Sequence, residues 1–83
     1  TAFAQCKLAI ELNPTADNYY NLGFINVKLN NKAVAESNFI KSTTLNPKFI
    51  KSFIDLGYVQ IDLNKLNKKK KLITRLQSTI YQN

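Results

Sequence analysis

Residues 16–47 read ADNYYNLGFINVKLNNKAVAESNFIKSTTLNP, and this stretch decides the fold of the chain. Apolar side chains recur on both sides of Asn30-Asn31 at intervals of mostly three or four residues, which is the spacing of one helical face. Asparagine side chains satisfy local backbone groups in turns, and Pro47 clashes with a continuing helix. The stretch therefore predicts two antiparallel helices joined by a polar turn.

Parts of this unit occur again on both sides of it. Leu22-Gly23 returns as Leu56-Gly57, and Leu12-Asn13-Pro14 returns at nearly the same spacing as Leu45-Asn46-Pro47. A recurrence of this kind, with a period of roughly 20–50 residues, is typical of stacked supersecondary units. Each glycine costs about 1 kcal/mol relative to alanine inside a helix, so both glycines predict points where two helices approach closely.

The unit resembles the tetratricopeptide repeat, a helix-turn-helix of about 34 residues with the pattern W-x2-L-G-x2-Y, A-x3-F and P. The matching residues are a tyrosine in the tryptophan position, the Leu-Gly pair, the Ala-x3-Phe pair and the closing proline: Tyr19, Leu22, Gly23, Ala35, Phe39 and Pro47. Asn26, in the tyrosine position, departs from the pattern. The resemblance implies an all-α fold of five helices, in which antiparallel helix-turn-helix repeats stack as a right-handed α-solenoid.

About two and a half repeats fit into the chain, which we expect to be one domain of a longer protein. Residues 1–14 would be the second helix of a preceding repeat, and residues 15–48 would be a complete repeat. Residues 49–83 would form a divergent repeat that caps the stack. Cys6 takes the phenylalanine position in the first of these units, and we expect it to be a small buried hydrophobe.

The last unit follows the pattern least well. Asn64 predicts a turn, and Lys69 stands where the family places alanine. The final helix would cover residues 66–81. Because Lys68–Lys71 would lie at its N-terminus, against the helix dipole, we expect this helix to fray or to begin nearer Lys70.

Composition excludes several classes of function. The chain has 83 residues, and a domain of this size is marginal alone. No apolar run approaches the roughly 20 residues that cross a bilayer, so we expect a soluble chain and favour a cytoplasmic location. The chain has no histidine and one cysteine. The sequence therefore predicts no enzyme, no metal and no cofactor.

The family resemblance implies a protein or peptide partner, which would lie in a concave groove lined by the first helices of successive repeats. By position in the pattern, the first set of groove residues would be Asp17, Tyr20, Asn21, Phe24, Val27 and Lys28. The second set would be Lys51, Ile54, Asp55, Tyr58, Ile61 and Asp62. Their apolar members would form one strip of the kind that binding hot spots use: Tyr20, Phe24, Ile54 and Tyr58. Alternatively, a neighbouring part of the same protein covers this strip.

The net charge of +7 raises a second hypothesis, in which the chain binds nucleic acid or an anionic surface. The possible anion contacts are Lys68, Lys69, Lys70, Lys71 and Arg75. Most other lysines are scattered, and Arg75 is the only arginine, although arginine is the favoured phosphate ligand. We therefore expect a solvated basic face and no nucleic-acid partner. A third hypothesis is a structural segment that assembles within a larger complex.

Overall fold

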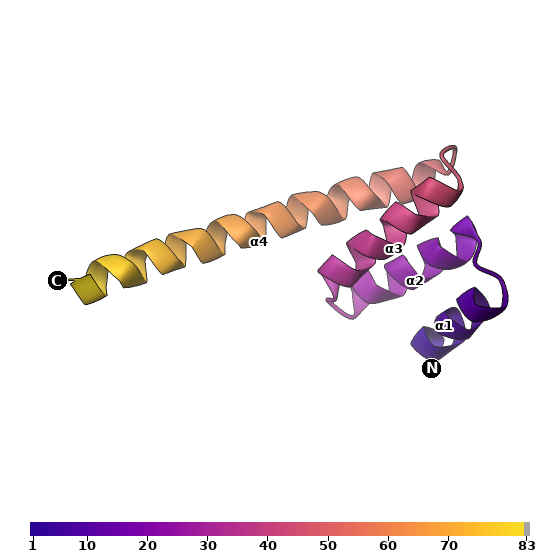
Figure 1. The fold of residues 1–83 in the computed structure, drawn as a ribbon, viewed down its shortest axis with the longest axis horizontal. Coiled ribbons are helices and arrows are strands. Elements are labelled where there is room, and N and C mark those ends of the chain that lie inside the picture. The colour runs from indigo at the N-terminus through magenta and orange to yellow at the C-terminus, as the bar shows by residue number, and fades with distance from the viewer. Residues whose placement is uncertain (83) are drawn as a thin grey trace.

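A computed structural model describes residues 1–82 as four helices and no strands (Figure 1). The helices are α1 (Ala2–Leu12), α2 (Ala16–Lys28), α3 (Lys32–Leu45) and α4 (Ile50–Gln82). Successive helices pack antiparallel. The prediction of an all-α, repeat-like fold is therefore confirmed, and the right-handed stacking of repeats stays a prediction. Asn83, the last residue of the expected third unit, lies outside the described residues.

Polar residues mark both ends of α2. The side-chain oxygen of Thr15 accepts a hydrogen bond from the backbone N–H of Asn18 at 3.2 Å, which caps the start of α2. After α2, Asn30 adopts a φ of 62°, in the left-handed region that asparagine tolerates better than most residues. The polar turn predicted at this point is confirmed.

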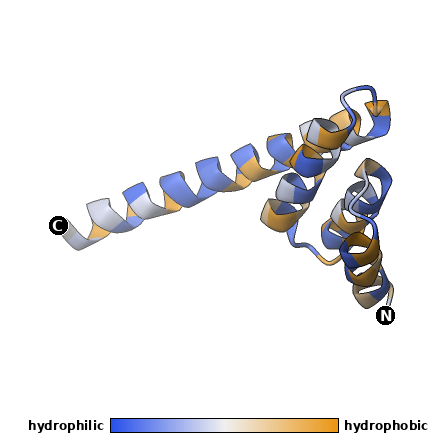
Figure 2. Ribbon diagram, turned by 45° about the vertical axis from the view of Figure 1, so that its right-hand side comes forward, coloured by the Kyte–Doolittle hydropathy of each residue, from blue (hydrophilic) through white to orange (hydrophobic). Residues whose placement is uncertain are grey.

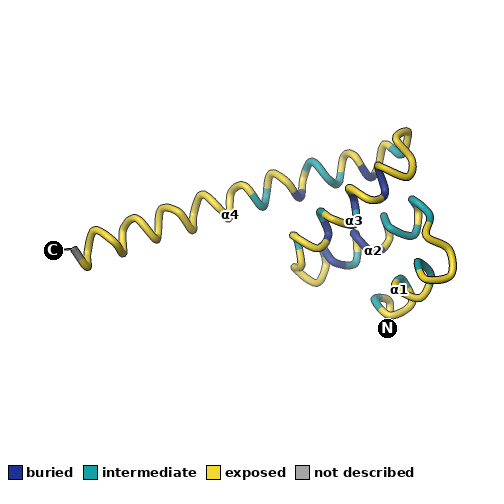
Figure 3. Tube along the Cα trace, viewed as in Figure 1, coloured by how far each residue is buried: buried dark blue, intermediate teal, exposed yellow. Residues whose placement is uncertain are grey.

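The core lies where α2, α3 and the first part of α4 meet (Figure 3). Its buried apolar residues are Leu22, Ala35, Phe39 and Val59. Buried polar residues are as numerous: Asn26, Ser42, Thr43 and Ser52. In α1 no residue is buried, and Cys6 is only half-buried, so the prediction of a buried cysteine was wrong. The molecule thus has a small core in which hydrogen bonds accompany apolar packing.

Hydrogen bonds between side chains fix how the helices meet. The Ser42 hydroxyl donates to the carbonyl of Ala16 at 2.8 Å and lies 2.6 Å from the Ser52 hydroxyl, which joins α3 to both neighbouring helices. Asn26, which departs from the family pattern, donates from Nδ2 to Oδ1 of Asn38 at 2.9 Å and so joins α2 to α3. Among the described residues, each buried side-chain nitrogen or oxygen has a partner.

The two glycines differ in their surroundings. A Cβ added to Gly23 would lie 2.6 Å from Cε1 of Phe39, so the predicted close approach of two helices is confirmed there. A Cβ added to Gly57 would meet no atom within 4 Å, so the same prediction was wrong for Gly57. The α2–α3 hairpin therefore requires a glycine, whereas the corresponding position of α4 is open.

The prediction of five helices was also wrong. Helix α4 is 33 residues long and passes through Asn64 without a break. A second hairpin would place Lys69 and Ile73 where Ala35 and Phe39 fill the first one. Burying an unpaired lysine is costly, so the segment gains little by folding back. Lys68–Lys71 therefore lies in the interior of a helix, and the expected effect of a helix N-terminus does not apply.

The second half of α4 projects away from the other helices (Figure 1). Residues 64–81 are all exposed, and hydrophilic residues predominate along this part (Figure 2). The radius of gyration is 16.5 Å, against about 12 Å for a compact chain of this length. None of the helices between residues 1 and 82 is both long and apolar enough to cross a membrane.

Candidate interaction surface on helices α2 and α4

Tyr20 connects α2 directly to α4. Its hydroxyl donates a hydrogen bond to Oδ2 of Asp55 at 2.7 Å. Its ring packs against those of Phe39 and Phe49, with centroids 5.7 and 5.3 Å away. The hydrogen bond to the Asp55 carboxylate, assisted by burial, raises the pKa of Tyr20 to about 12. Tyr20 therefore holds the two helices together. It is half-buried at their junction, and its hydroxyl is not available to a partner as the expected strip would require.

The other three members of the strip are exposed. Phe24 is 43% exposed, Ile54 52% and Tyr58 66%. Phe24 lies one turn after Tyr20 on α2, and Tyr58 lies three residues after Asp55 on α4. Because Tyr20 and Asp55 touch, these exposed side chains lie on neighbouring parts of two adjacent helices. We call Phe24, Ile54 and Tyr58 the α2–α4 surface.

Charged residues of both signs border this surface. The Lys28 ammonium lies 4.8 Å from the centroid of the Phe24 ring, a cation–π contact at the helix surface. Asp62 pairs with Lys32 at the start of α3, with 3.5 Å between Nζ and Oδ2. The remaining candidates divide by burial: Asp17, Asn21, Lys51 and Ile61 are exposed, whereas Val27 is half-buried and packs against the core.

Several residues that hold this arrangement were not singled out from the sequence as contributing to it. Phe49 follows the Pro47 turn and packs on Tyr20. Because it lies in the connection between two helices, the spacing of apolar residues along a helix could not identify it. Asn18 donates from Nδ2 to the carbonyl of Asn13 at 2.8 Å and so attaches α1 to α2. The available signal for the pairing of Asn26 with Asn38 was that Asn26 departs from the family pattern.

The basic residues of α4 do not form a single patch. Successive residues of a helix point about 100° apart, so Lys68–Lys71 surrounds the helix. Lys68, Lys71 and Arg75 share one side and border a surface pocket together with Leu72. All four residues come from one exposed helix, so no second element encloses this pocket.

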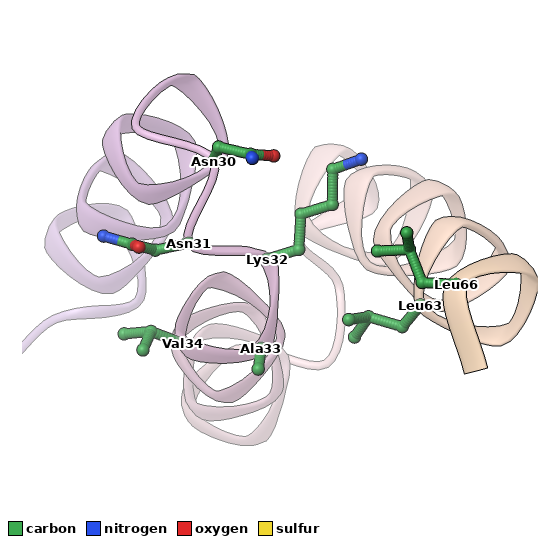
Figure 4. A pocket seen from close by; sticks show the side chains of 7 residues that line it. All are labelled: Asn30, Asn31, Lys32, Ala33, Val34, Leu63 and Leu66. Carbon is green, nitrogen blue, oxygen red and sulfur yellow. The ribbon is translucent and has the colours of Figure 1, made fainter. Parts of the chain in front are cut away.

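A second pocket lies between the α2–α3 turn and α4 (Figure 4). Leu63 and Leu66 point from α4 toward the start of α3. The residues that line it are Asn30, Asn31, Lys32, Ala33, Val34, Leu63 and Leu66. No candidate residue was predicted here, and among the described residues no three His, Cys, Asp or Glu side chains gather as a metal site would require.

The antiparallel hairpin with a glycine under an aromatic ring places the chain among the helical-repeat proteins. Residues 16–49 match the family model described as a tetratricopeptide repeat. Repeats of this family generally act as protein-interaction modules, and the proteins that contain them are typically non-catalytic scaffolds. Neither the curated proteins nor the solved structures gave a match to the chain.

Proposed function

We propose that the chain is a protein-interaction module that binds a peptide or a helix of a partner protein on the α2–α4 surface. The proposal includes the division of the chain into a preceding repeat at 1–14, a complete repeat at 15–48 and a divergent repeat at 49–83, whose described part is the single helix α4. The family match supports a protein partner in general. The location of the binding surface rests on the side chains of α2 and α4.

The observation that carries the proposal is the joint exposure of Phe24, Ile54 and Tyr58 on two helices that Tyr20 and Asp55 connect. Aromatic side chains supply large contact area at interfaces and are enriched among hot spots. Since Tyr20 and Asp55 fix the distance between the helices, a partner would meet a surface that is already ordered. Such preorganisation lowers the entropic cost of binding.

The basic side of α4 supports the alternative, nucleic-acid binding, less well. A protein that neutralises several phosphates needs its cations on one accessible face. Lys68, Lys70, Lys71 and Arg75 border two surface pockets of α4, but no residue of another helix lines either pocket, so the cations lie around a single helix. We therefore favour a protein or peptide partner and propose no nucleic-acid or membrane function.

A binding experiment with a double variant tests the proposal. Proteins retained by the wild-type chain are identified, and their affinities are then measured for Phe24→Ala/Tyr58→Ala. Tyr81→Ala is the control, because it removes an exposed aromatic residue from the far end of α4. Hot-spot truncations each cost about 2 kcal/mol, so the double variant should bind at least about 30-fold more weakly while its helical circular dichroism is unchanged.

Each outcome of this experiment decides the proposal. Loss of the partner with the double variant, and not with Tyr81→Ala, supports the α2–α4 surface. If all three proteins retain the same partner and salt releases it, the contact is electrostatic and the proposal fails. Equal binding by the double variant at high salt would also contradict it.

A further inference from the structure

Gly57 lies on a side of α4 where no described residue packs directly against it. A Cβ added there would meet nothing within 4 Å, and no glycine in the described chain has a positive φ. Neither packing nor backbone conformation within the molecule therefore requires a glycine at this position. Glycine in a helix interior lowers stability by about 1 kcal/mol relative to alanine. Among residues 1–82, no contact at Gly57 offsets this cost.

The complete repeat indicates what fits against such a position. In the α2–α3 hairpin, the Phe39 ring lies directly over Gly23, and Ala35 is buried one turn before it. Asn38, next to Phe39, accepts a hydrogen bond from Asn26. A helix that packs on a Leu-Gly pair of this chain thus carries a small residue, a polar residue and a large aromatic residue on one side.

The residues around Gly57 repeat the α2 side of this contact. Phe53 corresponds to Tyr19 and Gln60 to Asn26, at the same offset that relates Gly57 to Gly23. Phe53 is 47% exposed and Ile50 is 70% exposed. Gln60 is exposed, and it lines a pocket with Ala33 and Glu36 of α3. We call Ile50, Phe53, Gly57 and Gln60 the Gly57 face.

The Gly57 face is separate from the α2–α4 surface. Gly57 and Tyr58 are consecutive residues, and their directions from the helix axis differ by about 100°. The opposite side of α4 is occupied, because Ser52 and Val59 are buried against the rest of the fold. Residues 64–81 are exposed and extend away, so this part of α4 does not cover the Gly57 face.

We propose that the Gly57 face binds an amphipathic helix of a partner protein, antiparallel to α4, with a large aromatic side chain over Gly57. The partner helix carries a small residue four positions before the aromatic, as Ala35 precedes Phe39. A polar side chain next to the aromatic pairs with Gln60, as Asn38 pairs with Asn26. The contact continues the packing of the complete repeat onto the next helix of the same type, and it does not depend on the α2–α4 surface.

A synthetic peptide with the sequence of residues 31–47 is a suitable probe, because it is the helix that already fits a Leu-Gly pair of this chain. The chain contains two glycines, and backbone amides of glycine can be followed separately by NMR. On titration of the labelled full chain with this peptide, the Gly57 amide signal should shift while that of Gly23 stays in place. A peptide with Phe39→Ala should cause no shift.

Variants of the full chain make the test specific. Gly57→Leu fills the space over the glycine and should weaken peptide binding about tenfold or more, whereas Phe24→Ala on the α2–α4 surface should bind as the wild type does. The proposal fails if saturating peptide leaves the Gly57 signal unchanged or if Gly57→Leu binds equally well. It also fails if, without peptide, the Gly57 signal shifts as the protein concentration rises and the molar mass of the protein in solution is that of a dimer. A second copy of the chain would then occupy the Gly57 face.

Discussion

Replacing each glycine by alanine should change stability in opposite directions. Both substitutions gain about 1 kcal/mol of helix propensity. At Gly23 the new Cβ would lie 2.6 and 2.8 Å from two atoms of the buried Phe39 ring, and overpacking of this kind costs about 1–3 kcal/mol. We therefore expect Gly23→Ala to lower the free energy of unfolding by about 1 kcal/mol. Gly57→Ala meets open space and should raise it by about 1 kcal/mol.

Comparing the two variants isolates the steric cost, because the gain in helix propensity is common to both. For a domain of this size, 1 kcal/mol shifts Tm by roughly 4–8 °C. Thermal unfolding followed by circular dichroism should therefore place Gly57→Ala above the wild type and Gly23→Ala below it, with urea unfolding as the second measurement. Equal shifts in the same direction would refute the reasoning, since the rigid Phe39 contact would then have no energetic effect.

Three further predictions concern the hydrogen bonds and the projecting helix. Asn38→Ala should lower the free energy of unfolding in urea by about 1–3 kcal/mol, because the buried Asn26 amide loses one of its two acceptors and keeps only the carbonyl of Leu22; no change in the urea midpoint would contradict this. The phenol of Tyr20, with its pKa raised from 10.0 to about 12 by the hydrogen bond to Asp55, should give a late step in the alkaline absorbance titration that Tyr20→Phe removes. The stability that this bond contributes is fully present below pH 10 and is lost as pH rises through 12. In hydrogen exchange, amides of residues 64–81 should exchange faster than those of the buried core, because no tertiary contact protects them; equal protection would contradict the exposed helix.

The α2–α3 hairpin could be predicted from the sequence because its local and tertiary signals agree. Asn30 favours the turn, and Ala35 and Phe39 provide an apolar side that is worth burying once the chain has turned. Gly23 then allows the Phe39 ring to approach α2. Local propensity and packing thus favour the same hairpin, which is the condition for a reliable prediction from sequence.

In the last part of the chain, the sequence has a residue that favours a turn but lacks the small apolar residue that would make a second hairpin worth packing. Asn64 corresponds to Asn30, but Lys69 corresponds to Ala35, and a second hairpin would have to bury that charge. An asparagine only weakly disfavours a helix interior, so α4 continues. The prediction of the candidate surface was limited in a similar way. The position of Tyr20 in the repeat pattern identified it as a surface residue, but only the structure shows that its hydroxyl is hydrogen-bonded to Asp55.

The polar core connects the fold to its capacity for binding. Four buried apolar residues supply little of the burial on which a small domain depends, whereas hydrogen bonds at Ser42 and Asn26 fix the positions of the helices. Large apolar side chains that would strengthen a monomer, such as Phe24 and Phe53, lie instead at the surface, on two sides of the molecule. A partner that covers them would add apolar burial to a geometry already set by hydrogen bonds. Binding at either surface should therefore raise the melting temperature of the chain, since a ligand that binds only the folded state stabilises it.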